Sequence, residues 1–87
     1  MARTSSAAAV QLGTTLRELR LQRGLTIDQL AAASGIDSSN VRSYERGRAM
    51  MNVKTLVRLA EALEAESGDL LSGVTAAIFD ADLQVDA

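Results

Sequence analysis

The chain has 87 residues, a formal net charge of −2, and no cysteine, histidine, proline or tryptophan. This length fits one small domain, whose core must be aliphatic because the chain holds one Tyr and one Phe. The inventory excludes disulfides, thiolate or imidazole metal sites, and catalysis by a cysteine or a histidine base. No apolar run approaches the roughly 18 residues of a membrane span, and the start does not resemble a signal peptide. We therefore expect a cytoplasmic protein that is not an enzyme and carries no cofactor or metal.

The net charge conceals a strong asymmetry along the chain. Residues 1–58 hold all nine basic residues and four acids, a balance of +5, whereas residues 59–87 hold seven acids and no base. Nucleic-acid binding depends on the local field more than on the total charge. The acidic total is therefore weak evidence against DNA binding.

The first half of the chain predicts two helices. The first ends near Gly24 and has leucines at helical spacing, namely Leu12, Leu16 and Leu19. Thr26 is a natural N-cap for the second, which turns Leu30 and Ala31 inward and stops at Gly35.

Three further helices are predicted in the second half. Asp37 caps a third, which turns Val41 and Tyr44 inward and ends at Gly47. Asn52 caps a fourth, whose apolar stripe is Val53, Leu56, Leu59, Ala60 and Leu63. A short fifth helix around 67–71 closes the core with Leu70 and Leu71.

The second and third predicted helices form a helix-turn-helix candidate. Ala31 is small enough for a steep helix crossing, and Gly35 can enter the left-handed conformation at the turn. With the apolar residues turned inward, the third helix presents a polar outer face with no free acid, narrow enough for a DNA major groove. That face comprises Ser38, Ser39, Asn40, Arg42, Ser43 and Arg46.

Residues 12–71 resemble the Cro/repressor-type (XRE-like) helix-turn-helix family of DNA-binding domains. The resemblance is carried in register by "LRELRLQRGLTIDQLA", "SGIDSSNVRSYERG" and "LVRLAEALEAESGDLL". It implies an all-α fold, a compact five-helix bundle of the lambda-repressor-like type. We expect a flexible segment at 1–10, the helix-turn-helix domain at 11–72, and a C-terminal extension at 73–87.

The resemblance also assigns roles to single residues. It places four residues at base-reading positions, Ser38, Ser39, Arg42 and Ser43, of which Arg42 is the best candidate for specificity because a guanidinium binds guanine in a bidentate manner. It places four others near phosphates, Thr26, Asn40, Arg46 and Arg48. Each of these also has a plain structural reading, as a cap, a surface polar group or a cation at a helix end.

Arg20 and Glu45 match the two family positions that form an ion pair between the first and third helices. We expect this pair to be largely buried and structural. Three positions depart from the family pattern. Ile27 replaces a common phosphate-binding Gln, Met51 replaces a common Pro, and Glu64 occupies a usual Gly position, which suggests a longer or more helical turn.

The resemblance implies a transcriptional regulator that binds an inverted-repeat operator in double-stranded DNA as a homodimer. An antitoxin that binds both its operator and a toxin is the alternative, and a protein-interaction module without DNA binding is the second. Residues 73–87 are open to three interpretations: a tail, a strand added in a dimer, or an element that contacts a partner protein. The expected dimer surface lies in the acidic C-terminal part, with apolar area from Leu63, Leu70, Leu71, Ile78 and Phe79.

Overall fold

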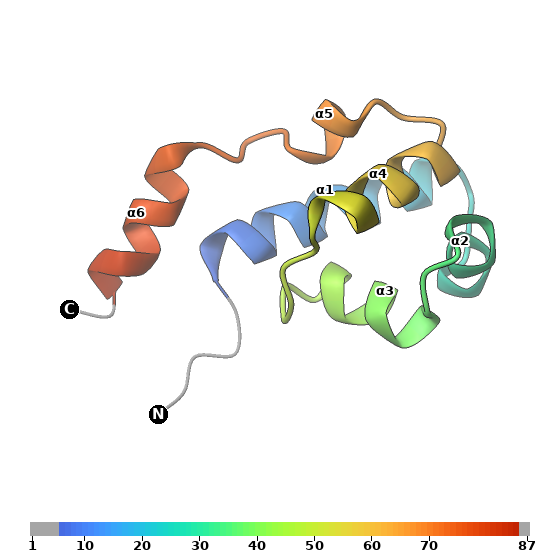
Figure 1. The fold of residues 1–87 in the computed structure, drawn as a ribbon, viewed down its shortest axis with the longest axis horizontal. Coiled ribbons are helices and arrows are strands. Elements are labelled where there is room, and N and C mark those ends of the chain that lie inside the picture. Colours follow the sequence, from blue (N-terminus) through green and yellow to red (C-terminus); the bar gives the residue numbers. More distant parts are fainter. Residues whose placement is uncertain (1–5, 86–87) are drawn as a thin grey trace.

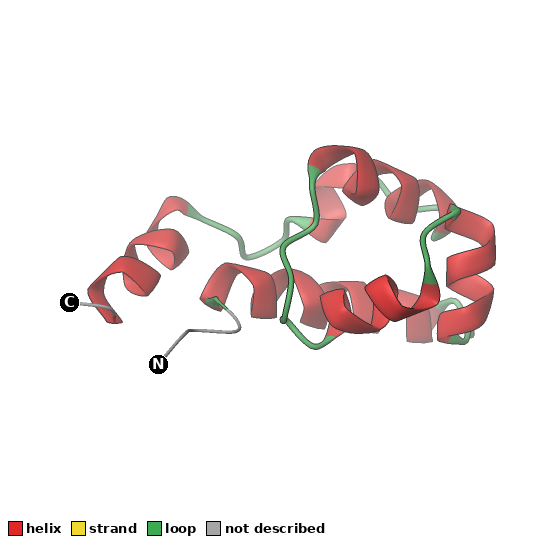
Figure 2. Cartoon of the chain, turned by 60° about the horizontal axis from the view of Figure 1, so that its bottom comes forward, coloured by secondary structure: helices red, strands yellow, loops and turns green. Residues whose placement is uncertain are grey.

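A computed structural model describes the backbone of residues 6–85 and the side chains of residues 6–80, and the described part is all-α (Figure 1, Figure 2). It confirms the predicted fold class but contains six helices where five were expected. They are α1 (Ala7–Gln22), α2 (Ile27–Ser34), α3 (Ser38–Glu45), α4 (Val53–Ala62), α5 (Ser67–Leu70) and α6 (Ala76–Val85).

The helices begin at residues whose side chains cap them. The side-chain oxygens of Thr26, Asp37 and Asn52 accept backbone N–H groups from the first turns of α2, α3 and α4, as predicted. Such a bond satisfies one of the N–H groups that a helix start leaves without a partner. At Thr26 the bond is reciprocal, because the Gln29 side chain accepts the Thr26 N–H at 2.9 Å.

Two of the turns between helices depend on a residue in the left-handed backbone conformation. Gly35 ends α2 at φ 74° and lets the chain turn into α3. Glu64, with φ 56°, is the only described residue other than glycine with a positive φ. The longer or more helical turn expected here is wrong: α4 ends at Ala62, and Glu64 takes the backbone conformation that usually selects glycine.

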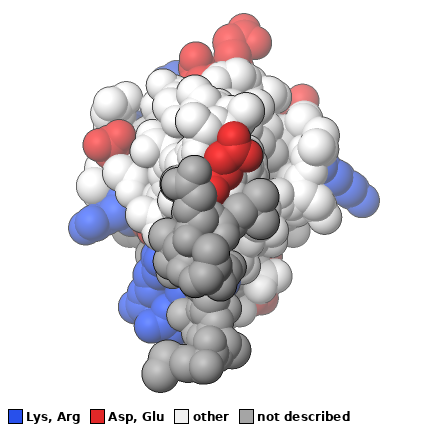
Figure 3. Space-filling model, turned by 90° about the vertical axis from the view of Figure 1, so that its left-hand side faces the viewer, with Lys and Arg blue, Asp and Glu red and all other residues white. Residues whose placement is uncertain are grey.

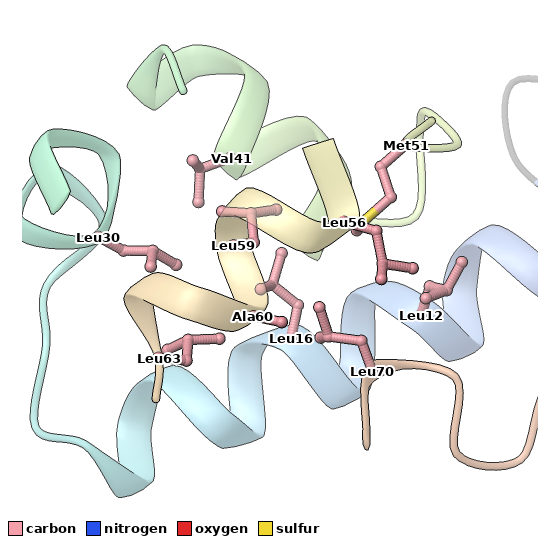
Figure 4. Close-up of a cluster of buried hydrophobic side chains, with 10 residues drawn as sticks. All are labelled: Leu12, Leu16, Leu30, Val41, Met51, Leu56, Leu59, Ala60, Leu63 and Leu70. Carbon is pink, nitrogen blue, oxygen red and sulfur yellow. The ribbon is translucent and has the colours of Figure 1, made fainter. Parts of the chain in front are cut away.

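The core lies between α1, α4 and the helix-turn-helix, with α5 closing one side (Figure 4). Its buried members are Leu12, Leu16, Leu30, Val41, Met51, Leu56, Leu59, Ala60, Leu63 and Leu70. The prediction of burial is wrong for two residues: the side chains of Val53 and Leu71 are 77% and 44% exposed. Val53 is the first residue of α4, and Leu71 follows the last residue of α5, so both lie at helix ends.

Helix α1 approaches α3 closely at Gly13, which is buried in the middle of α1. A Cβ atom at this position would clash with the Tyr44 carbonyl oxygen and lie 2.9 Å from that of Glu45. The close approach requires a residue without a side chain. It also fixes the C-terminal turn of α3 against α1.

Both ends of the chain are more helical than expected. Residues 7–10, assigned to a flexible segment, form the first turn of α1, where Ala8 and Ala9 are buried; residues 1–5 lie outside the described part. Residues 76–85 form α6 beside the N-terminal part of α1, so the added strand is wrong for this stretch (Figure 1). None of the described helices is long and apolar enough to cross a membrane.

Candidate nucleic-acid interface

Helix α3 turns one side to the core and the other to solvent. Val41 is fully buried, and Ile36 and Tyr44 pack against the core from the two ends of the helix. The opposite side carries three exposed residues that are expected to contact DNA, namely Ser39, Asn40 and Arg42. Arg46 is exposed just after the last turn. Two others are half-buried, Ser38 and Ser43. The structure thus places the four expected base-reading residues on one short helix and leaves two of them, Ser39 and Arg42, exposed.

A bidentate ion pair joins α1 to α3. The Nε and Nη2 atoms of Arg20 donate to the two carboxylate oxygens of Glu45 at 2.6 and 2.9 Å, and Nη1 donates to the Leu25 carbonyl at 2.8 Å. The hydrogen bond to Glu45 raises the pKa of Arg20 above its usual value. Both side chains are at most 10% exposed. The Glu45 carboxylate is therefore neutralised within the protein and adds little negative charge to the outer face of α3.

A first basic hollow of about 280 Å³ lies where α1, the start of α2 and the end of α3 meet. Its lining comprises Arg17, Arg20, Ile27, Arg42, Glu45 and Arg46. Within the described part of the chain, Arg17, Arg42 and Arg46 make no hydrogen bond or ion pair through their guanidinium groups. Three unpaired guanidinium groups around one hollow attract an anion. Ile27 contributes only an apolar wall to it.

A second hollow of about 410 Å³ lies at the opposite end of α3. It is formed by the turn after α2 and the first turns of α4, with Gly35, Ile36, Asn52, Lys54, Thr55 and Arg58 as its lining. Lys54 and Arg58 likewise have no partner among the residues that the structure describes. Sequence reasoning missed Arg58, although its spacing of four from Lys54 places both on one side of α4.

Two other expected phosphate contacts, Thr26 and Arg48, differ in the hydrogen bonds that they already make within the protein. The Thr26 hydroxyl accepts the Gln29 N–H at 3.0 Å and keeps its own proton for another acceptor. Arg48 is exposed in the loop after α3, where its backbone N–H donates to the Ser43 carbonyl at 3.0 Å. Thr26 therefore combines a capping role with a free donor, and the Arg48 side chain has no described partner.

The expectation that this face carries no free acid is wrong at one point. Asp37 is fully exposed at the N-terminus of α3, and its carboxylate accepts bonds from the Ser39 N–H, at 3.2 Å, and from the Ser39 hydroxyl. These bonds lower the pKa of the Asp37 carboxyl, so it is ionised at neutral pH. The sequence identifies Asp37 as a helix cap, and its position beside Ser38 and Ser39 is the signal that its charge lies at the same surface.

Comparisons with known proteins agree with this geometry. The family model described as "Helix-turn-helix domain" matches residues 11–72. The chain is 32% identical over 76 residues to the transcriptional regulator SutR of Escherichia coli, covering 84% of this chain and 43% of SutR. It is 36% identical over 61 residues to the uncharacterized transcriptional regulator y4dJ of Sinorhizobium fredii, covering 70% of this chain and 79% of y4dJ.

Solved structures with the same fold include the restriction-modification controller protein C.AhdI from Aeromonas hydrophila. That match has a TM-score of 0.70 at 40% identity and covers 71% of this chain and 94% of C.AhdI. The clp gene regulator ClgR from Corynebacterium glutamicum matches with a TM-score of 0.73 at 29% identity, over 91% of this chain and 84% of ClgR. The chain spans half or less of the length of several curated relatives that it matches.

Proposed function

The chain belongs to the Cro/repressor-type helix-turn-helix family of transcriptional regulators, and from this premise we propose that it binds a specific operator in double-stranded DNA with α3 in the major groove. The observation that carries the proposal is the arrangement of charge around α3. The unpaired cations of the two hollows lie at its two ends, and the one acid in its last turn is neutralised by Arg20.

The proposed contacts divide into two groups. Phosphates are bound at the C-terminal end of α3, where Arg46 and Arg48 follow the helix and the start of α2, with Thr26, lies nearby; Asn40, exposed on α3, adds a further contact. These contacts orient the domain without reading sequence. Base edges are read by Ser38, Ser39, Arg42 and Ser43. The exposure of Ser39 and Arg42 supports direct contact with bases. Ser38 and Ser43 are half-buried, so their short side chains can contact only a base that lies close to α3.

We further propose that two copies bind an inverted repeat. One domain of this kind buries about 600–1,000 Å² on DNA, and a symmetric pair doubles that area. The expected dimer surface needs one correction, because Leu63 and Leu70 are fully used in the core of a single chain. Exposed apolar side chains that support a contact at the α5–α6 end are Val10, Leu71 and Phe79.

Selection of bound sequences from random DNA tests the proposal. We expect an enriched inverted repeat whose half-sites lie about 34 Å apart, one helical turn, with affinity that falls steeply as salt concentration rises. A pool that shows no enriched sequence, or binding that is indifferent to salt, would contradict DNA recognition by α3.

Arg46→Ala tests the phosphate contacts separately. Because Arg46 has no partner in the described protein, its loss should weaken binding to all sequences alike and reduce the salt slope by about one. Arg23→Ala is the matched control: Arg23 is 47% exposed, donates to the Glu64 carbonyl at 3.0 Å, and lies outside both hollows. Equal effects of the two substitutions in fluorescence-anisotropy titrations would contradict the assignment of Arg46.

A further inference from the structure

The second hollow contains two cationic side chains to which the contacts proposed above give no role. Lys54 and Arg58 lie four residues apart on α4 and both line this hollow of about 410 Å³. Both are exposed, and their charged groups make no hydrogen bond or ion pair with another described residue. Like charges four residues apart on a helix repel each other, and an anion bound between them removes the repulsion. The hollow therefore has the charge to bind an anion.

The guanidinium group of Arg58 lies against the turn between α2 and α3. A Cβ atom at Gly35 would lie 3.3 Å from Nη1 of Arg58, which is closer than an ordinary contact. Gly35 provides the positive φ of the turn and, because it has no side chain, also leaves the space that this guanidinium occupies. Arg58 thus reaches from α4 to the residues that precede α3, and its N–H donors are not used by the described protein.

None of the described residues that line the second hollow is acidic. Asp37 follows the lining residue Ile36 in the chain, but it lies outside the lining and its carboxylate accepts the Ser39 N–H. Glu61 is exposed one turn after Arg58 and forms no ion pair with it. The charge of the second hollow is therefore not neutralised by a carboxylate of the described chain, and an external anion is the partner that fits it.

The distance between the two hollows corresponds to the width of a DNA groove. The first basic hollow includes Arg42 and Arg46 at the C-terminal end of α3, and the second includes Gly35 and Ile36 just before its N-terminal end. Helix α3 has 8 residues and is therefore about 12 Å long at a rise of 1.5 Å per residue. The major groove is about 12 Å wide and has one sugar-phosphate backbone on each side. A duplex that receives α3 thus brings one backbone to each hollow.

On the basis of the proposed DNA binding, we infer that the second hollow is a phosphate-binding site in which Arg58 and Lys54 hold the strand opposite to the one bound at the first basic hollow. The planar guanidinium of Arg58 can donate two parallel hydrogen bonds to one phosphate, and Lys54 adds a point charge beside it. Helix α3 is then held from both of its ends. Both residues are positioning residues, because phosphate contacts fix the register of a helix in the groove without reading the sequence.

Ethylation interference on an operator recovered by selection tests the assignment of strands. Ethylation of single phosphates should block binding of the natural protein on both strands of each half-site. Arg58→Ala should abolish the interference at a phosphate of one strand, and Arg46→Ala should abolish it on the other strand. Arg58→Ala and Lys54→Ala should each lower affinity about three- to tenfold and reduce the salt slope by about one, with the enriched sequence unchanged.

Two further variants separate charge and folding from phosphate binding. Arg58→Lys keeps the charge but not the bidentate geometry, so it should restore the salt slope and only part of the affinity. Arg23→Ala is the control outside both hollows, and all these variants should melt near the temperature of the natural protein because each side chain is exposed.

The outcomes distinguish this inference from the function on which it rests. If the natural protein enriches no sequence or binds DNA independently of salt, the proposed function fails. If it binds an operator but Arg58→Ala and Lys54→Ala behave like Arg23→Ala, or Arg58→Ala and Arg46→Ala lose interference on the same strand, this inference is overturned and the function stands. Weaker self-association of Arg58→Ala in sedimentation experiments, with an unchanged interference pattern, would assign the hollow to an acidic segment of a second copy and would also overturn it.

Discussion

The α1–α3 region and the α5–α6 region differ in charge and in how firmly they are packed. Around α3 the described cations without partners surround an outer face whose last acid is paired with Arg20. From residue 59 onward the chain has only acids, and among the described ones only Glu64 forms an ion pair, with Arg23 at 3.5 Å. Seen from the α6 end, most of the described visible surface is uncharged, with acidic side chains near the centre and the upper margin and basic side chains at the sides and below (Figure 3).

This comparison explains why the total charge is a poor guide to the partner. A net charge of −2 is the sum of two opposite regions, and in the proposed complex DNA contacts only the surface beside α3. The two regions also differ in attachment. Helix α3 is held to α1 by a buried bidentate pair and by the close approach at Gly13. Of the described α6 side chains, Ile78 is half-buried and Phe79 is 47% exposed.

The largest expected effect comes from breaking the bond between α1 and α3. Glu45→Ala leaves the Arg20 guanidinium buried without its carboxylate and should lower the free energy of unfolding by about 3–5 kcal/mol. Urea denaturation followed by circular dichroism measures the loss. Glu18→Ala, which removes an exposed acid from α1, should change it by less than about 0.5 kcal/mol. A loss below 1 kcal/mol for Glu45→Ala would mean that the pair does not hold α3 in place.

Two adjacent leucines at the end of α5 sharpen the same comparison. Leu70 is fully buried and Leu71 is 44% exposed. Leu70→Ala creates a cavity in the core and should cost about 2–4 kcal/mol. Leu71→Ala should cost less than about 1 kcal/mol and, if this end forms the dimer contact, should weaken self-association in sedimentation experiments. Equal losses of stability for the two substitutions would show that Leu71 is as much a part of the core as Leu70.

The helix starts were predictable from the sequence because capping is a local property. Thr26, Asp37 and Asn52 each bond to N–H groups two or three residues away, so the sequence neighbourhood contains the whole interaction. Periodicity was less reliable at helix ends. Val53 and Leu71 continue the apolar pattern, but both lie at a helix end and are exposed, although Met51 just before Val53 is buried.

Properties that depend on two distant segments were harder to predict. The contact between Arg20 and Glu45 could be predicted only from the family resemblance, because no spacing rule indicates it. The two hollows gather residues from separate segments, so the sequence alone does not single out Arg58 from other surface charges.

Replacing Gly13 should give the smallest of the three losses of stability. It also has the opposite sign to the effect of the same substitution in an isolated helix. In an isolated helix, alanine is more favourable than glycine by about 1 kcal/mol. Here the added methyl group would meet the backbone carbonyls of Tyr44 and Glu45, which cannot move without shifting α3, so Gly13→Ala should destabilise by about 1–3 kcal/mol. Gly68→Ala is the matched change in α5, where nothing lies within 4 Å of the new atom, and it should be neutral or stabilising. Because the clash displaces the helix proposed to contact DNA, Gly13→Ala should also weaken operator binding more than its loss of stability explains. Stabilisation by both substitutions in thermal melts would show that α1 and α3 are not packed this closely.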